Sequence, residues 1–272
     1  MMHKTMDTTP RLVIVARIDY APGWDRDAVS MMTSRSAAER AAFALDRLSD
    51  GMRVLDVGCG PGTISMGLAR AIAPSGRLLG VDAEISQVTA ALEYARRTET
   101  SQARFVAASA YDLPVETGSV DVYFSHALYE HLQNPERALF EARRVLRPGG
   151  ALAVAASDWS RARFDPLTAD IELAMSGHYA LRRQAGGDPF AGSGLRGWVQ
   201  TAGFVDIAES VHQRVDLGYQ ELAAYVRARL LAAAPTSPPG MNLGEAALAA
   251  DRWATETGTV TQCWVEVTAI AP

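Results

Sequence analysis

The sequence predicts an α/β domain with a seven-stranded, mostly parallel sheet and helices on both faces, and three observations support this fold class. Over residues 51–158, short apolar runs rich in β-branched residues alternate with amphipathic segments of helical period. A glycine-rich turn joins the first of these runs to the next helix. After residue 158 the alternation stops, and two later runs supply the last strands. Such alternation is typical of a parallel sheet that is covered on both faces.

The elements of the first half follow in a regular order. Residues 53–59 (RVLDVGC) form a short apolar run that ends in glycines, as a buried parallel strand does. The helix over 63–73 ends at Pro74, because proline cannot continue a helix. The helix over 135–146 begins with Pro135, which is favoured in the first helical turn. The same patterns predict strands over 77–83, 104–109, 120–127 and 151–157, and a helix over 85–97.

The second half is less regular. Helices are expected within 26–48 and over 194–203, 219–234 and 245–256, with strands over 205–216 and 259–271. The last strand shows the apolar alternation of a sheet with two different faces. Four segments follow: a tail and lid helices over 1–50, a core over 51–158, an insertion that forms an acceptor lid over 159–193, and the C-terminal part of the sheet with added helices over 194–272.

The composition favours a folded cytoplasmic enzyme. Hydrophobic residues make up 48 % of the 272 residues, and the formal net charge is −5. A nucleic-acid partner is not expected, because no basic run is present. A membrane partner is not expected either, since no apolar stretch reaches the roughly 18 residues that a span needs. Cys59 and Cys263 are far apart and predict neither a metal site nor a disulfide framework.

The strongest motif is VLDVGCGPGT over 54–63. Gly58, Gly60 and Gly62 end a strand and open a helix, where glycine permits positive φ and lets a ligand approach the backbone. The N–H groups at the start of that helix favour an electron-rich ligand. The dinucleotide fingerprint G-x-G-x-x-G has a different spacing, and the Gly-Lys-Ser/Thr of a phosphate-binding P-loop is absent.

This motif resembles motif I of the class I S-adenosyl-L-methionine (SAM)-dependent methyltransferases. The likeness extends over roughly residues 35–157 and is strongest to the small-molecule, ubiquinone/menaquinone-biosynthesis-like branch, methyltransferase type 11. The GVDA segment over 80–83 and the RVLRPGGAL segment over 144–152 follow in the order of that family. The resemblance implies a Rossmann-like fold, SAM as cofactor and S-adenosyl-L-homocysteine as product.

The resemblance also implies a set of cofactor-binding residues. Asp82 is at the position of the acidic residue that binds the ribose hydroxyls, because a carboxylate accepts such O–H bonds strongly. Ser109 departs from the family, which often has an acid or an amide there. Arg35 could pair with the SAM carboxylate. The full set is Tyr20, Arg35, Asp56, Gly58, Gly60, Pro61, Gly62, Asp82, Ala83, Ser109, Ala110, Tyr111 and Ser125.

Chemistry is expected where the fourth predicted strand ends, because ligands bind at the carboxyl ends of parallel strands. The segment SHALYEHL over 125–132 supplies His126, Tyr129 and His131 as catalytic candidates, with Glu130 between them. Histidine is suited to a base, and His126 ranks ahead of His131, which is better explained as a residue that caps a helix or supports its neighbours. Four aromatic or imidazole side chains are candidates for the acceptor pocket or for the lid's own core: Trp24, His178, Tyr179 and Phe190.

The leading functional prediction is methyl transfer from SAM to an O, N or C atom of a small-molecule substrate, in secondary metabolism or quinone biosynthesis. One alternative is a cyclase or lyase of this fold that uses SAM without transferring its methyl group. Others are a non-catalytic SAM-binding module and an NAD-dependent dehydrogenase, which the glycine spacing disfavours. No metal is expected, and both a monomer and a homodimer fit the sequence.

Overall fold

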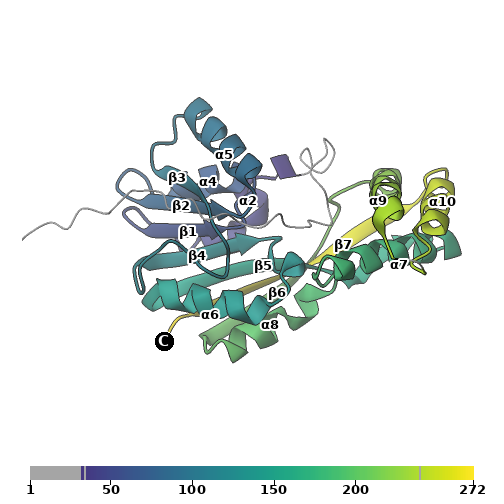
Figure 1. Cartoon of the computed structure of the whole chain (residues 1–272). Coiled ribbons are helices and arrows are strands. Elements are labelled where there is room, and N and C mark those ends of the chain that lie inside the picture. The colour runs from purple at the N-terminus through teal and green to yellow at the C-terminus, as the bar shows by residue number, and fades with distance from the viewer. Residues whose placement is uncertain (1–31, 34, 239) are drawn as a thin grey trace, which may run out of the picture.

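The computed structural model describes residues 32–33, 35–238 and 240–272 of the chain. They contain one seven-stranded sheet in the order β3-β2-β1-β4-β5-β7-β6 (Figure 1). Strand β7 is antiparallel to both of its neighbours, and the other strands run parallel to one another. The predicted fold class is therefore confirmed. The strands are β1 Arg53–Val57, β2 Arg77–Asp82, β3 Ala103–Ala107, β4 Val120–His126, β5 Leu146–Asp165, β6 Val205–Arg214 and β7 Thr259–Ile270.

Helices cover both faces of the sheet. The core on one face joins α4 and α5 to β1, β2 and β4, with Met66 and Phe124 at its centre. The core on the other face joins α6 and α8 to β4, β5 and β7, with Leu139 and Leu195 fully buried. The helices are α2 Ala37–Arg40, α3 Ala42–Leu45, α4 Thr63–Ala71, α5 Ile85–Arg97, α6 Pro135–Val145, α7 Ala169–Gln184, α8 Ala191–Thr201, α9 Tyr219–Ala233 and α10 Leu243–Trp253, with short 3-10 turns at Tyr129–His131 and Ala234–Thr236.

A third core lies beyond the main sheet. Strand β5 continues past the predicted end at residue 157 as far as Asp165, because it keeps pairing with β7 up to Thr259. Helices α7, α9 and α10 pack together beside this extended ribbon around the buried Trp253 (Figure 1). The segment over 159–193, predicted as an insertion without a clear strand that forms an acceptor lid, therefore consists of the end of β5, helix α7 and the start of α8.

Helix α7 has sequence signals that its weak amphipathic pattern hides. The Thr168 side chain accepts a hydrogen bond from the Ile171 N–H and so caps the first turn. Acidic residues occupy the first turn and basic residues the last, as the helix dipole favours. Among the described residues, no helix is long and apolar enough to cross a membrane.

Candidate functional site

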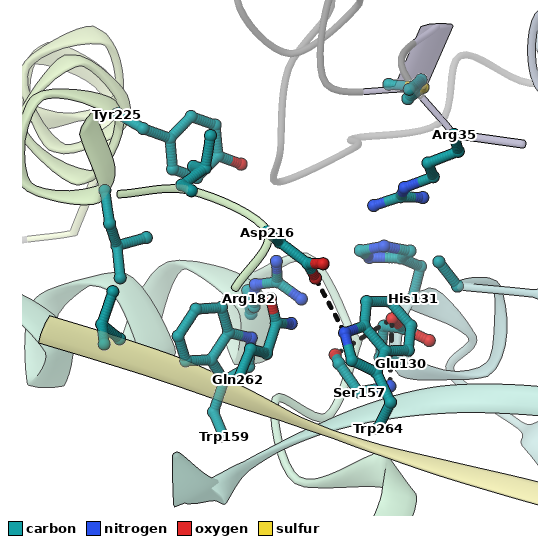
Figure 2. Close-up of a pocket in the computed structure, with 15 residues that line it drawn as sticks. Arg35, Glu130, His131, Ser157, Trp159, Arg182, Asp216, Tyr225, Gln262 and Trp264 are labelled. Atoms are coloured by element: carbon teal, nitrogen blue, oxygen red, sulfur yellow. Dashed lines mark hydrogen bonds between the residues drawn. The ribbon is translucent and has the colours of Figure 1, made fainter. Parts of the chain in front are cut away.

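Two adjoining cavities lie above the carboxyl ends of the central strands. We call the first the loop cavity; it is lined by the glycine loop, the ends of β2 and β3 and the segment after β4, over residues 57–61, 63–64, 81–84, 87, 108–111, 126–128 and 131–132. We call the second the aromatic cavity; it is lined by Glu130, Ser157, Trp159, Arg182, Asp216, Leu217, Leu222, Tyr225, Val260, Gln262 and Trp264 (Figure 2). The two spaces adjoin, since four residues line both: Met32, Arg35, Ala127 and His131.

The glycine loop between β1 and α4 has the backbone that its sequence predicts. Gly58, Gly60 and Gly62 have φ values of +74°, +52° and +80°, in the left-handed region that favours glycine. A Cβ on Gly62 would lie 3.0 Å from the Cβ of Ala91, so this glycine lets the loop pack against α5. A Cβ on Gly60 would meet nothing closer than 3.9 Å, so this part of the loop is open toward the cavity.

Asp82 connects the end of β2 to the glycine loop. Its Oδ2 accepts a hydrogen bond of 2.9 Å from the Gly60 N–H, and its Oδ1 accepts one of 2.9 Å from the Glu84 N–H. Burial raises the pKa of Asp82, and these two N–H donors act in the opposite direction. A carboxylate has about four lone-pair sites, so Asp82 can accept further O–H donors in the loop cavity that it lines.

Asp56 lies behind the loop and is not among the residues that line either cavity. Its Oδ2 accepts a hydrogen bond of 2.5 Å from the Ser65 hydroxyl of α4. Burial raises the pKa of Asp56 to about 7, against the opposing effect of Ser65. The structure therefore shows Asp56 joining β1 to α4, and its part in cofactor binding stays a prediction. Gly62 likewise lies outside the cavity linings, because it packs against α5 and shapes the backbone of the glycine loop.

The segment after β3 forms another wall of the loop cavity. Ser109, Ala110 and Tyr111 all line it, as do Pro61 and Ala83. The Ser109 hydroxyl accepts a hydrogen bond of 3.2 Å from the Tyr111 N–H and so shapes this turn. Ser125 of β4 is different. It is fully buried and lies outside both linings, and its contact with the cofactor stays a prediction.

His126, at the end of β4, lines the loop cavity. Its ring stacks on Trp264, with ring centroids 4.5 Å apart and an interplanar angle of 23°. Burial and the guanidinium groups of Arg35 and Arg40 hold the pKa of His126 well below its usual range. The imidazole is therefore neutral at physiological pH.

His131 lies at the junction of the two cavities. Burial, Arg182 and Arg35 hold its pKa well below the usual value, so this imidazole is also neutral. Tyr129, two residues earlier, is 0 % exposed, and its hydroxyl lies 3.2 Å from that of Tyr123. Burial raises the pKa of Tyr129 well above its usual value. Tyr129 is thus a core residue, which corrects its prediction as a catalytic one.

The predicted acceptor-binding residues of the lid lie behind the cavity wall. Tyr179 and Phe190 pack edge to face, with ring centroids 5.2 Å apart. His178 contacts the ring of Tyr225 and accepts a hydrogen bond of 3.3 Å from Arg182 Nε. None of the three lines the aromatic cavity in the described part of the chain, and Tyr179 and Phe190 pack against the third core, beside α7, α9 and α10. Tyr20 and Trp24, also predicted at the site, lie outside the described residues.

Sequence reasoning missed most of the aromatic cavity. Trp159 comes from β5, Arg182 from α7, and Gln262 and Trp264 from β7. The one available signal was the alternation of β7, which places Gln262 and Trp264 on the same face of the strand. Among the described residues, no group of three or more His, Cys, Asp or Glu side chains could hold a metal ion.

Comparison with known proteins agrees with this geometry. A family model described as "Methyltransferase domain" matches residues 48–184. An uncharacterized methyltransferase of Schizosaccharomyces pombe is 32 % identical over 199 residues, which are 71 % of this chain and 70 % of that protein. An uncharacterized 37.1 kDa protein in transposon TN4556 of Streptomyces fradiae is 38 % identical over 54 % of this chain, but the match spans only 43 % of that protein's length.

The fold is also that of a solved structure, the [4+2]-cyclase SpnF. It aligns with a TM-score of 0.56 and 22 % identity, over 92 % of this chain and 83 % of that one. The strand order, the glycine loop and the family match together define the fold and the family of this protein. The chain belongs to the class I SAM-dependent methyltransferases.

Proposed function

We propose that this protein transfers the methyl group of SAM to a small-molecule acceptor bound in the aromatic cavity. The observation that carries the proposal is the shared lining of the two cavities at Arg35, Ala127 and His131. A ligand in the loop cavity and a ligand in the aromatic cavity meet there. Methyl transfer needs this proximity more than any other contribution from the protein, since alignment of the reacting atoms supplies much of the rate.

The loop cavity fits the chemistry of SAM. Asp82 offers carboxylate oxygens for the two ribose hydroxyls, and the residues Ser109–Tyr111 flank the space for the adenine ring. The Gln87 Oε1, which has no hydrogen-bond partner among the described residues, is a further acceptor in the same lining. Arg35 provides a guanidinium for the SAM carboxylate. When bound, SAM supplies a methyl group that its positively charged sulfur has already activated.

The chain's own residues would orient the acceptor and receive its proton. The neutral imidazole of His131 faces both cavities and can take a proton from an acceptor O–H or N–H group. His126 lines the loop cavity alone, so we assign the base role to His131. The indole rings of Trp159 and Trp264 give the acceptor an apolar surface that limits the access of water.

A small molecule is the proposed acceptor because its site is a lined cavity and the chain carries a net charge of −5, which disfavours nucleic acids. The quinone-biosynthesis-like branch, the cytoplasmic location and the choice between monomer and homodimer stay predictions of the sequence.

The test is methylation by the purified chain. The protein is incubated with methyl-labelled SAM and a panel of small hydroxylated, amino and activated-carbon compounds, and product masses are recorded. The expected result is a product that has gained one labelled methyl group, and the Asp82→Asn variant should form it more slowly. A product of unchanged mass would contradict methyl transfer and favour a cyclase-like or lyase-like reaction on the same fold.

A further inference from the structure

The aromatic cavity contains a buried cation that forms no ion pair with the described residues. Arg182, in the last turn of α7, is 7 % exposed and lines this cavity (Figure 2). Its Nε donates to His178 Nε2 at 3.3 Å, and its Nη1 is buried without a hydrogen-bond partner among the described residues. The described residues also give it no ion pair. Burial of an unpaired charge is costly, and proteins normally provide a partner for it.

The two carboxylates in the same lining, Asp216 and Glu130, form their hydrogen bonds and ion pairs with residues other than Arg182. Asp216 forms an ion pair with Arg40 and accepts a hydrogen bond of 2.7 Å from Trp264 Nε1. Glu130 accepts hydrogen bonds from the hydroxyl and the N–H of Ser157, at 3.0 and 3.4 Å. Burial raises the pKa of Glu130, which favours its neutral form, and the charge of Arg182 acts in the opposite direction without a hydrogen bond or ion pair between the two groups. Neither carboxylate contacts the guanidinium.

His178 does not neutralise the guanidinium either. Burial and the neighbouring Arg182 and Arg229 hold its pKa well below the usual value, so it acts as a neutral acceptor. A second buried donor of the cavity lacks a partner: the Nε1 of Trp159 has no acceptor among the described residues. Besides Arg35 at its junction with the loop cavity, the aromatic cavity thus has two N–H donors, Arg182 Nη1 and Trp159 Nε1, for which the described residues supply no acceptor.

We propose that the methyl acceptor is a monoanionic, unsaturated or aromatic carboxylic acid whose carboxylate pairs with Arg182. The inference rests on the proposed function, because it assigns the aromatic cavity to the acceptor. A guanidinium matches a carboxylate through two parallel N–H donors, and the Trp159 indole N–H can add a third. The rings of Trp159, Trp264 and Tyr225 suit a flat apolar body. A single negative charge fits better than two, because Glu130 and Asp216 lie in the same lining.

The test measures binding of matched acids and amides. Cinnamic and hydroxybenzoic acids and their neutral carboxamides are titrated into the full chain saturated with S-adenosyl-L-homocysteine, and quenching of tryptophan fluorescence is followed. We expect the acids to bind about tenfold or more tightly than the amides, as for a charged hydrogen bond. Arg182→Met should remove this preference, and Arg182→Lys should keep part of it.

Arg183→Met is the matched control. Its guanidinium lies 4.9 Å from the ring centre of Phe190 and outside the cavity lining, so the acid preference should remain. Arg182→Met should also keep or raise the Tm of the ligand-free protein, whereas loss of a structural contact would lower it.

Several outcomes would overturn the inference. The inference is contradicted if the acids bind no better than the amides, or if neither binds. It is also contradicted if the Arg182→Met variant still prefers acids to amides. Weaker binding of S-adenosyl-L-homocysteine to Arg182→Met would instead assign the residue to the cofactor. Failure of the proposed function can be distinguished from failure of this inference. In that case the wild-type chain would bind no S-adenosyl-L-homocysteine or would transfer no methyl group.

Discussion

The histidines near the site share an electrostatic environment that a sequence pattern does not reveal. The positive charges of Arg35 and Arg40 act on His126. Those of Arg182 and Arg35 act on His131. Positive neighbours and burial both disfavour protonation of imidazole. A neutral imidazole is the form that can accept a proton, so this environment keeps a base available at the pH of most cells.

This environment predicts that protonation of His126 and His131 occurs only well below pH 6.5. The measurement is an NMR titration of the histidine ring signals, with each signal assigned by a His→Gln variant. His131→Gln should also lower turnover about 100-fold, the usual contribution of a general base, while SAM affinity stays within about twofold. The exposed His212 of β6 is the control, and His212→Gln should not change turnover. A ring of His131 that titrates near 6.5, or full activity of His131→Gln, would contradict the base assignment.

The second residue-scale prediction concerns Asp82. Replacement by Ala should weaken SAM binding by about 2 kcal/mol, since a charged acceptor of ribose hydroxyls and of the Gly60 N–H is lost. Asp82→Asn keeps the shape and shows the effect of charge alone, and calorimetry measures both. Asp50→Asn is the matched control, because that carboxylate accepts the Ser75 N–H outside the site. Equal affinities in all the variants would remove Asp82 from the ribose site.

At the residue scale, the sequence predicted the loop cavity better than the aromatic cavity. The motifs that follow the strands along the chain contain several residues of the loop cavity. Because each motif directly follows a strand, its residues lie at the strand ends, as is the case for Pro61, Asp82, Ala83 and Ser109. Arg182 belongs to no such motif. Its proposed role rests on burial without an ion pair among the described residues, which is a property of the packed structure.

At the scale of elements, β1 and α4 are joined through a carboxyl group rather than through apolar contacts alone. Asp56 of β1 and Ser65 of α4 are both buried and hydrogen-bonded to each other. Burial raises the pKa of Asp56 to about 7, whereas an aspartate in the unfolded chain releases its proton near 4. The folded state therefore binds more protons than the unfolded state between these two pH values.

The prediction is that the contribution of Asp56 to the free energy of unfolding falls as pH rises from about 4 to about 7. Asp56→Asn should remove this component, which amounts to about 4 kcal/mol over the window. Denaturant unfolding at a series of pH values measures it. Ser65→Ala should extend the decline to higher pH, because the Ser65 hydroxyl lowers the pKa of Asp56. Identical pH slopes in wild type and Asp56→Asn would contradict the assignment.

At the scale of the whole molecule, contacts between distant parts of the chain hold the site together. Asp216, after β6, forms an ion pair with Arg40 of α2 and a hydrogen bond with Trp264 of β7. Arg47, after α3, donates to the Thr268 hydroxyl of β7 at 3.1 Å. Helices α2 and α3 are thereby joined to β7, and two of the residues involved, Asp216 and Trp264, also line the aromatic cavity. A ligand at the junction of the two cavities should stabilise the whole fold rather than one segment.

The corresponding prediction is a ligand-dependent Tm. S-adenosyl-L-homocysteine at about 100 times its dissociation constant should stabilise the chain by about 2.7 kcal/mol, which corresponds to a rise in Tm of about 5 °C or more. NAD at the same concentration should leave the Tm unchanged, because the glycine spacing differs from the dinucleotide fingerprint. A larger shift with NAD would favour a dehydrogenase.

The sequence by itself determined the fold class, the order of the core strands and the glycine loop, because these depend on local periodicity and on residues that are neighbours in the chain. Only the tertiary structure decided the aromatic cavity and the positions of Tyr129, His178 and Ser125. Trp159, Arg182 and Trp264 come from β5, α7 and β7, and they meet because the β5–β7 ribbon extends beyond the main sheet. Burial, counter-charges and pKa shifts arise from such long-range packing, and no local pattern encodes them.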